Sequence, residues 1–510
     1  MSGTAESAGS RRWILAGLMA TMMLAAMDST IVSTAIPQIV GDLGDFSLFA
    51  WVFSIYVLAQ TVTIPVYGKL ADQFGRKPVL IVGTLVFLAG SAASAGAWSM
   101  LSLIVFRAFQ GLGAGSIMAT VNTLAGDLFS IRERARVQGW LSSMWGLSAI
   151  IGPALGGAFA EYASWRWIFL VNLPVGAVSL VLIGRNLHES FARSRHRVDF
   201  SGAALVLATV GMLVLGLLQG GEQWPWLSLP SGIVFAFVLV FAALTIAVER
   251  RAAEPILPAW LWRRRVLAGS NLAMVGMGIV MMGPIAYLPT FAQSVYGLGA
   301  IAAGFLLAAM SVGWPIASAL SGRIYLRLGF RDSALGGGVL MVLAAVGFLA
   351  LPDPGPVWAV VLDQVVLGAG FGLLSTPLLV GVQSVVGWEE RGVVTGTNMF
   401  ARYLGQSLGA AIFGAIFNAA LASQLAAAPA ALRSRLPQQV NEVIHALHDP
   451  ALGAAARGFL RHAIYVATHH IYWGIALLSI LTLACVLVAP GRFPLVGGDG
   501  GPRRSANGNT

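Results

Sequence analysis

Fourteen long apolar runs constrain the fold of this chain more than any other feature of its sequence. A helix needs about twenty predominantly apolar residues to cross a bilayer, and only helices and closed barrels satisfy the backbone polar groups inside one. The runs cover residues 13–36, 48–67, 79–97, 101–125, 137–160, 167–185, 200–219, 230–248, 267–291, 301–322, 334–351, 356–381, 394–422 and 464–489. The sequence therefore predicts an all-α polytopic membrane protein.

The composition agrees with this prediction. Of the 510 residues, 57% are hydrophobic and 10% are charged, whereas about a quarter of the residues in soluble domains are charged. The net charge of +10 does not indicate a nucleic-acid partner, because the cations lie in gaps between apolar runs and not in basic stripes on a polar surface.

The sequence lacks the patterns of a soluble catalytic site. It contains no phosphate-binding G-x-x-x-x-G-K-[ST] motif, so ATP is not expected to drive the protein. It shows no Cys/His spacing typical of a metal site, and its single cysteine, Cys485, lies in the last apolar run. We expect no enzyme activity, no metal and no cofactor.

The distribution of Lys and Arg predicts the orientation. These residues are retained in short cytoplasmic loops. Placing the N-terminus inside assigns most of the 31 cations to inside loops and tails, including the clusters at 132–136, 193–197 and 263–265. Both termini are then cytoplasmic. The first run exceeds a typical signal segment and contains Asp28, so it is expected to remain as a helix in the plasma (inner) membrane.

Spaced glycines indicate an internal repeat. Gly68 and Gly75 are matched by Gly322 and Gly329 at an offset of 254 residues. At an offset of 257, two further groups match: Gly111, Gly113 and Gly115 with Gly368, Gly370 and Gly372, and Gly152 and Gly157 with Gly409 and Gly414. Such repeats are typical of transporters whose halves rock about a central site.

The repeat predicts three regions. Residues 1–199 form a six-helix bundle, residues 200–250 two additional transmembrane helices, and residues 251–510 a second six-helix bundle. A long extracytoplasmic loop at 423–462 interrupts the second bundle, where several prolines break the apolar pattern.

The segment 68–80 reads G-K-L-A-D-Q-F-G-R-K-P-V-L and is a short charged hinge between two apolar runs. Its glycines permit tight turns and close helix approach, and Arg76 and Lys77 mark the cytoplasmic side. A loop that only sets topology would explain the cations but not Asp72 and the glycines. The pattern resembles the signature between the second and third helices of the major facilitator superfamily.

This resemblance implies the major facilitator fold of two six-helix bundles. The two extra helices between the bundles are similar to those of the fourteen-helix drug:proton antiporter family. In family terms, the loop motif belongs to a cytoplasmic charge cluster that stabilises the outward-open state. We expect Asp127, with Arg132 and Arg136 at the inner end of the fourth helix, to join the cluster formed by Asp72, Arg76 and Lys77.

Asp28 is the most specific candidate for proton coupling. It lies fifteen residues after Trp13, or about 22 Å along a helix, and a carboxylate at that depth marks an ion or substrate pathway by default. The surrounding M-D-S-T-I-V-S-T-A-I-P resembles the first-helix motif of the fourteen-helix family. The alternative is a structural carboxylate satisfied by Ser29, Thr30 or a neighbouring helix.

Two further charged residues lie inside apolar runs. Arg107 begins the sequence R-A-F-Q-G-L-G-A-G, which resembles a fourth-helix element of the superfamily, and Asp28 and Asp363 are the nearest intramembrane acids in sequence. A proton relay through Arg107 and a structural ion pair are both open. Asp363 can bind a cationic group of a substrate or a second proton.

The fifth apolar run carries a glycine-rich element. It comprises Gly146, Gly152, Pro153, Gly156 and Gly157. Glycines at this spacing let helices pack closely, and a proline inside a helix kinks it. The element resembles the antiporter signature of the superfamily, and its second-half counterpart has Ala410 in place of the proline. This signature favours export over uptake.

The sequence as a whole predicts a proton-coupled exporter of amphipathic, cationic or zwitterionic compounds that works by alternating access. Its partners are small molecules, protons and membrane lipid, and the protein is expected to be monomeric. Arg402, Trp51 and Tyr56 are candidates for the substrate cavity, although Arg402 could instead extend to the membrane interface. The alternatives are an exporter of a specific metabolite, lipid or siderophore, and a sensor that has lost transport.

Overall fold

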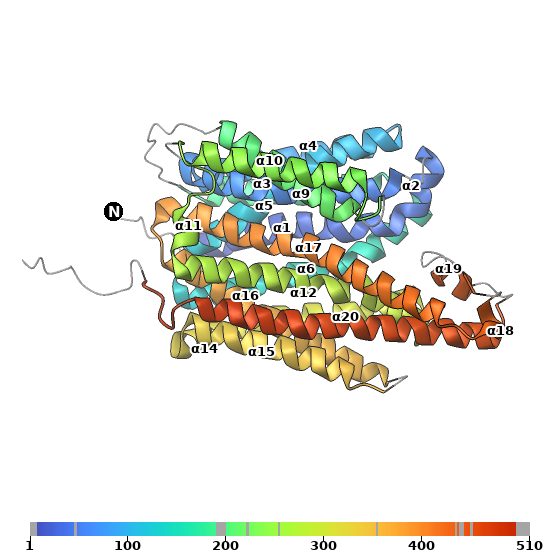
Figure 1. Cartoon of the computed structure of the whole chain (residues 1–510). Coiled ribbons are helices and arrows are strands. Elements are labelled where there is room, and N and C mark those ends of the chain that lie inside the picture. Colours follow the sequence, from blue (N-terminus) through green and yellow to red (C-terminus); the bar gives the residue numbers. More distant parts are fainter. Residues whose placement is uncertain are drawn as a thin grey trace, which may run out of the picture.

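The computed structural model describes residues 8–44, 48–189, 200–220, 224–252, 255–352, 355–433, 436–437, 443–448 and 452–495. Its long helices lie side by side along a common direction (Figure 1). Apart from one isolated bridge between Gly220 and Trp224, the described residues contain no strand pairing. The predicted all-α fold is confirmed.

The helices follow the predicted runs closely. The first part of the chain contains α1 (Ala8–Ile31), η1 (Val32–Ala35), α2 (Ile36–Leu43), α3 (Phe49–Phe74), α4 (Arg76–Ala95), α5 (Met100–Leu128), α6 (Ile131–Tyr162), α7 (Trp167–Leu170), α8 (Asn172–Asn186), α9 (Phe200–Gln219) and α10 (Leu229–Glu249). The second part contains α11 (Trp260–Arg263), α12 (Arg265–Ser294), α13 (Ala300–Ala308), α14 (Met310–Leu328), α15 (Phe330–Leu349), α16 (Val357–Ser384), η3 (Trp388–Glu390), α17 (Arg391–Ala426), α18 (Ala430–Arg433), α19 (Val443–His448) and α20 (Ala454–Val488).

Twelve helices within the described residues are long and apolar enough to cross a membrane. The other two predicted crossings are also helical but fall short of that standard. The apolar part of α9 covers only Ser201–Leu217, and α6 begins with four charged side chains and is rich in glycine. The total of fourteen crossings therefore stays a prediction.

The predicted outer loop is shorter than expected. The sequence places it at 423–462, but α17 continues to Ala426 and α20 already begins at Ala454. Residues 454–463 contain Arg457 and Arg461, and hydropathy alone therefore starts the apolar run only at residue 464. The helix begins earlier because good helix formers extend it beyond the apolar zone. The loop itself includes the short helices α18 and α19.

The first predicted crossing, 13–36, is interrupted. Helix α1 ends at Ile31, and a 3₁₀ turn leads into α2. This change of winding comes three residues after Asp28, at the level of the candidate proton site.

The internal repeat is visible in the backbone. Gly75 links α3 to α4 at φ +94° and ψ 152°, and Gly329 links α14 to α15 at φ +93° and ψ 164°. Only glycine adopts such a conformation without strain. The equivalent positions 68 and 322 are also both closely packed. A Cβ atom added to Gly68 would lie 2.6 Å from Gly392 O, and a Cβ atom added to Gly322 would lie 2.7 Å from Ala135 Cβ.

Two helix pairs make the most extensive contacts between the parts of the chain before and after the α9–α10 hairpin. Helix α3 packs against α17, and α6 packs against α14. Before the hairpin, α3, α4 and α5 pack together and α1 packs on α6 and α8. After it, α12 packs on α17 and α20, and α16 on α14 and α15. The hairpin itself lies against α3 and α17.

One end of the bundle is sealed. Every residue from 392 to 401 in α17 is buried, as is every residue from 374 to 386 at the end of α16 and from 113 to 126 in α5. All three stretches lie at the end that carries Gly75 and Gly329, called the Gly75 end below. Both described ends of the chain are also there, because Ser10 Oγ donates to Asn186 O and Phe493 packs on Phe330.

Candidate functional site

Asp28 on α1 and Arg107 on α5 form an ion pair in the interior of the bundle. Arg107 Nη1 lies 2.5 Å from Asp28 Oδ2, and neither side chain has exposed surface. Gln110 Nε2 donates to the other carboxylate oxygen at 2.8 Å. The carboxylate is thus satisfied by α5 and not by its own helix, because Ser29 and Thr30 donate to carbonyl oxygens of α1.

Further helices enclose the guanidinium. Arg107 Nε donates to Val52 O at 3.3 Å, and its Cζ lies 4.2 Å from the centroid of the Tyr56 ring, a cation–π contact. From α8, Asn172 Nδ2 lies 3.5 Å from Asp28 Oδ1. Four helices therefore converge on one charge pair, while Arg107 Nη2 has no acceptor among the residues that the structure describes.

The chemistry of this pair depends on one proton. A guanidinium stays charged in proteins, so the net charge changes only when Asp28 gains or loses its proton. Protonation leaves a buried cation without its counter-ion, which is costly in a low dielectric. The two protonation states therefore favour different packing of α1 against α5.

Asp363 lies elsewhere and has no contact with this pair. Its Oδ2 accepts a hydrogen bond from Gln364 Nε2 at 3.0 Å, and the same amide nitrogen donates to Tyr472 Oη at 3.0 Å. The carboxylate faces Gly347 of α15, so Asp363 belongs to the packing of α15, α16 and α20. The structure brings together two of the three predicted proton-coupling residues.

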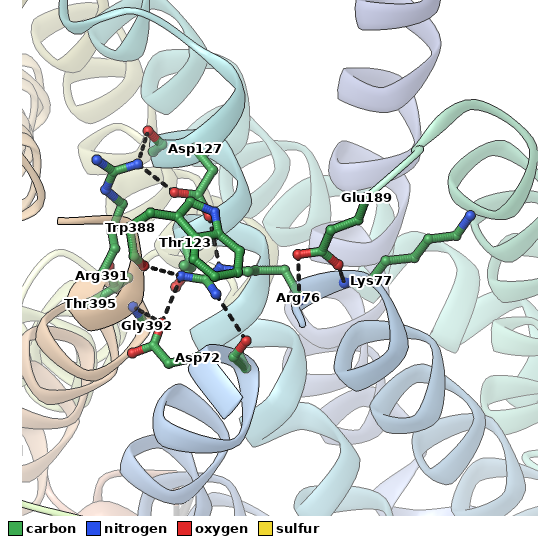
Figure 2. Close-up of polar contacts among 12 residues, drawn as sticks. Asp72, Arg76, Lys77, Thr123, Asp127, Glu189, Trp388, Arg391, Gly392 and Thr395 are labelled. Carbon is green, nitrogen blue, oxygen red and sulfur yellow. Dashed lines mark hydrogen bonds and ion pairs between the residues drawn. The ribbon is translucent and has the colours of Figure 1, made fainter. Parts of the chain in front are cut away.

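The Gly75 end carries the predicted charge cluster, which we call the carboxylate latch (Figure 2). Arg76 is fully buried; its Nη2 lies 2.7 Å from Asp72 Oδ1, and its Nε lies 2.9 Å from Asp127 Oδ2. Asp72 also accepts the backbone N–H groups of Gly392 and Val393 at 2.8 and 2.7 Å. These N–H groups belong to the first turn of α17 and have no acceptor within that helix. Asp72 on α3 therefore caps α17 across the interface between the two helices.

Two residues of the carboxylate latch were not predicted from the sequence. Arg391 Nη1 lies 2.5 Å from Asp127 Oδ1. The backbone carbonyl of Trp388 accepts a hydrogen bond from Arg76 Nη2 at 2.5 Å. The Trp388 ring also stacks on the Arg76 guanidinium, with its centroid 3.6 Å from Cζ. The internal repeat contained the signal, because Arg391 and Trp388 are the equivalents of Arg134 and Ile131 at an offset of 257.

Lys77 was wrongly assigned to the cluster. Its Nζ donates to Gly184 O and Leu187 O at 2.9 and 2.6 Å, and Figure 2 shows its side chain extending away from Asp72 and Asp127. A cation there complements the carbonyl end of α8. In return, Glu189 accepts the backbone N–H groups of Arg76 and Lys77. Lys77 therefore joins α4 to α8.

Arg132 and Arg136 were also wrongly assigned to the charge cluster. Both are exposed at the start of α6, whereas Arg134 is buried. Arg134 donates to Phe129 O at 2.9 Å, to Gly126 O, and to Ser384 Oγ at 3.3 Å. The helical period places 134 on the inner face and its neighbours two positions away on the outer face.

The glycine element of α6 serves two interfaces. A Cβ on Gly152 would lie 2.1 Å from Thr30 Oγ1 of α1, and one on Gly146 would lie 3.0 Å from Ser311 O of α14. Gly156 is buried, but a Cβ on Gly157 would meet nothing within 4 Å, so close packing is not the reason for that glycine. Helix α6 runs through Pro153, which is exposed, without interruption.

The candidate cavity residues separate in the structure. Tyr56 is buried against Arg107, so it supports the ion pair. Trp51 is half-buried at the start of α3. Arg402 is half-buried on α17, and its guanidinium lies 5.9 Å from the centroid of the Trp314 ring.

Comparison with known proteins identifies the fold. The family model described as Major Facilitator Superfamily matches residues 18–199 and 197–410. The chain belongs to the major facilitator superfamily. As a member, it is a multi-pass membrane transporter and not an enzyme.

Relatives within the superfamily include two proteins of Bacillus subtilis (strain 168). The chain is 35% identical over 415 residues to Multidrug resistance protein 3, with 80% of each covered. It is 35% identical over 399 residues to Multidrug transporter protein MdtP, covering 78% of this chain and 73% of the relative. The human organic anion transporter MFSD10 (TETRAN) has the same fold, with a TM-score of 0.63 at 14% identity over 93% of this chain and 99% of that one.

Proposed function

We propose that this major facilitator protein exports amphipathic compounds in exchange for protons by alternating access. The observation that carries the proposal is the fully buried Asp28–Arg107 pair, where one proton decides whether a buried cation keeps its counter-ion. The names of the two bacterial relatives, which refer to multidrug resistance and multidrug transport, support drugs as substrates. The buried glycines of α6 agree with the antiporter signature.

The sealed end supports an assignment of the conformation. The Lys and Arg distribution favours a cytoplasmic position for the Gly75 end, where both described ends of the chain lie. A carboxylate latch that closes this end then corresponds to the outward-facing state. We also propose the fourteen-helix branch, because α9 and α10 form a hairpin that follows the first six long helices.

Protonation supplies the coupling. When Asp28 is charged, it holds α5 through Arg107 and Gln110; when it is neutral, the packing around the guanidinium must change. A compound transported in the opposite direction has to prefer the other state, because a ligand with equal affinity for both states shifts nothing. The predicted preference for cations is not part of the proposal, since Asp28 and Asp363 already have partners.

The test is drug-driven proton movement in proteoliposomes that contain a pH dye. A panel of amphipathic dyes of positive, neutral and negative charge is added to the unaltered chain, to Asp28→Asn and to the control Asp332→Asn, which removes an exposed carboxylate. We expect Asp28→Asn to reduce the dye-dependent pH change by at least about tenfold, because Asn cannot exchange the proton, while the control keeps the signal.

Each other outcome has a consequence. Equal signals from Asp28→Asn and the unaltered chain would reject Asp28 as the coupling acid, and Asp363→Asn would be tested next. A response to a single compound would favour a specific metabolite, lipid or siderophore. The absence of any signal across the panel would overturn proton-coupled drug export.

A further inference from the structure

Arg402 is a guanidinium far inside the membrane-crossing part of α17. It lies eleven residues after Arg391, where the helix begins, or about 17 Å along the helix axis. It directly follows the stretch 392–401, in which every residue is buried, and it is itself half-buried. Arg402 is therefore the first residue of α17 beyond the sealed Gly75 end.

No acidic side chain compensates this charge within the part of the chain that the structure describes. Arg107 and Arg76 are each paired with carboxylates, whereas Arg402 makes neither an ion pair nor a hydrogen bond there. Its Nε is buried without an acceptor. A charged residue at such a depth is costly and marks a substrate or ion pathway.

The guanidinium points into the protein and not toward lipid. Its Cζ lies 5.9 Å from the centroid of the Trp314 ring on α14 and 4.9 Å from that of the Tyr403 ring. Trp314 in turn contacts Phe371 of α16 at 5.6 Å between ring centroids. Helix α14 packs against α6, α15 and α16, so a side chain that reaches Trp314 from α17 crosses the interior of the bundle.

Polar groups continue from Arg402 along one face of α17. Asn398 and Gln406 lie one helical turn before and after it, and Asn398 Oδ1 is buried without a donor. Next to Arg402, Tyr403 Oη accepts a hydrogen bond from Gln60 of α3 at 3.4 Å. Tyr403 points about 100° away from Arg402 around the helix. The face of Asn398 and Gln406 instead meets α12, where Asn398 donates to Asn271 Oδ1 and Gln406 donates to Met281 Sδ.

We propose that Arg402 binds the anionic group of a transported compound. The planar guanidinium matches a carboxylate with two parallel hydrogen bonds, and the rings of Trp314 and Tyr403 offer apolar faces to the body of the molecule. The substrate class is an amphipathic carboxylate with an aromatic or aliphatic body. This inference rests on the proposed export function and adds the charge of the substrate to it.

The test uses a matched pair of probes: 8-(dansylamino)octanoic acid and its methyl ester. The two share the aromatic group and the chain and differ only in the carboxylate. Binding is measured by dansyl fluorescence with the purified full chain in detergent, and transport is measured in proteoliposomes. The variants are Arg402→Gln, Arg402→Lys, and the control Arg327→Gln, which removes an exposed cation of α14.

We expect Arg402→Gln to weaken binding of the acid by at least about tenfold and to leave binding of the ester within about twofold. Arg402→Lys should lie between the two, because an ammonium keeps the charge but not the bidentate geometry. The control should bind both probes as the unaltered chain does. Size-exclusion chromatography establishes that each variant remains folded.

An equal loss for acid and ester, or an unchanged affinity for the acid in Arg402→Gln, would overturn the inference. So would failure of the unaltered chain to bind the acid. In each case, dye-driven proton movement in the preceding assay would still stand, so the failure of this inference and the failure of the export proposal are distinguishable.

Discussion

At the scale of single residues, the environments of three arginines inside the helix bundle differ in what surrounds the charge. Arg107 has a carboxylate, an amide and an aromatic face, all in the interior. Arg76 has two carboxylates and two backbone carbonyls at the Gly75 end. The Arg402 guanidinium lies near two aromatic rings, those of Trp314 and Tyr403. The three guanidinium groups therefore differ in the chemistry of their surroundings.

The first prediction concerns Asp127, the acceptor shared by Arg76 and Arg391. Asp127→Ala leaves both guanidinium groups without that acceptor, which costs about 1–3 kcal/mol for a buried group and weakens closure of the Gly75 end. The readout is maleimide labelling of Ala135→Cys in a Cys485→Ser background, since Ala135 is 1% exposed at that end. Labelling should accelerate about tenfold, the factor that corresponds to 1.4 kcal/mol.

The control for this experiment is Glu389→Ala, which removes an exposed carboxylate beside Trp388. It should leave the labelling rate unchanged. Identical rates for Asp127→Ala and the unaltered chain would show that the carboxylate latch does not hold this end closed.

At the scale of elements, the turn from α3 to α4 combines a glycine conformation with a helix clasp. Gly75 supplies the positive φ, and Glu189 accepts the N–H groups that α4 exposes at its start. Lys77 completes the exchange by donating to carbonyls at the end of α8. The equivalent turn at Gly329 keeps the backbone conformation, and its following helix carries Asp332 in the first turn.

The second prediction uses these two turns as a pair. Gly75→Ala and Gly329→Ala should each lower the free energy of unfolding by roughly 1–3 kcal/mol, the cost of holding a residue with a Cβ in this sparsely populated region of positive φ and extended ψ. The loss should be greater at Gly75, because its Cβ would lie 3.0 Å from Glu189 Oε2, whereas the nearest atom at Gly329 is 3.6 Å away. Apparent melting temperatures in detergent measure both.

Gly184→Ala is the control of opposite sign. It lies inside α8 with open space around it, and Ala is favoured over Gly in a helix by about 0.5–1 kcal/mol. Its melting temperature should rise or stay the same. A fall in Gly184→Ala as large as in Gly75→Ala would contradict the conformational explanation.

At the scale of the whole molecule, the Gly75 end is closed by two contacts related by the repeat. Arg391 donates to Gln383 O and reaches Asp127, whereas its equivalent Arg134 donates to Gly126 O and reaches Ser384. The acceptor is a carboxylate in one copy and a hydroxyl in the other.

A second pair of contacts involves two positions related by the repeat. Trp388 O accepts from Arg76, and its equivalent Ile131 O accepts from Tyr325. We call the contacts of Arg134 and Tyr325 the carboxylate-free latch. The repeat therefore closes one end with one set of contacts that includes carboxylates and one set in which every acceptor is an uncharged oxygen.

The third prediction follows from this asymmetry. Tyr325→Phe removes a neutral hydrogen bond, worth about 0.5–1.5 kcal/mol, so labelling of Ala135→Cys should accelerate less than in Asp127→Ala. Combining the two substitutions should multiply their effects, since both oppose the same opening. A double variant that labels no faster than Asp127→Ala would show that the two latches do not act independently.

The helices and the positions of the repeat can be predicted from the sequence alone. Each of these follows from a local property: about twenty apolar residues for a crossing, and a glycine wherever φ must be positive, as at Gly75 and Gly329. The depth of Asp28 and Arg107 also follows from counting residues along a helix. Boundaries such as the start of α20 are less local, because good helix formers extend beyond the apolar zone.

Which charges meet depends on how the helices pack. Lys77 follows Arg76 directly but turns to α8, whereas Arg391 comes 264 residues after Asp127 and pairs with it. Neighbours in a helix point in different directions, about 100° apart, so sequence proximity says little about partnership. Whether Asp28 or Arg402 finds a counter-charge depends on which helices pack together, and that packing is a property of the whole bundle.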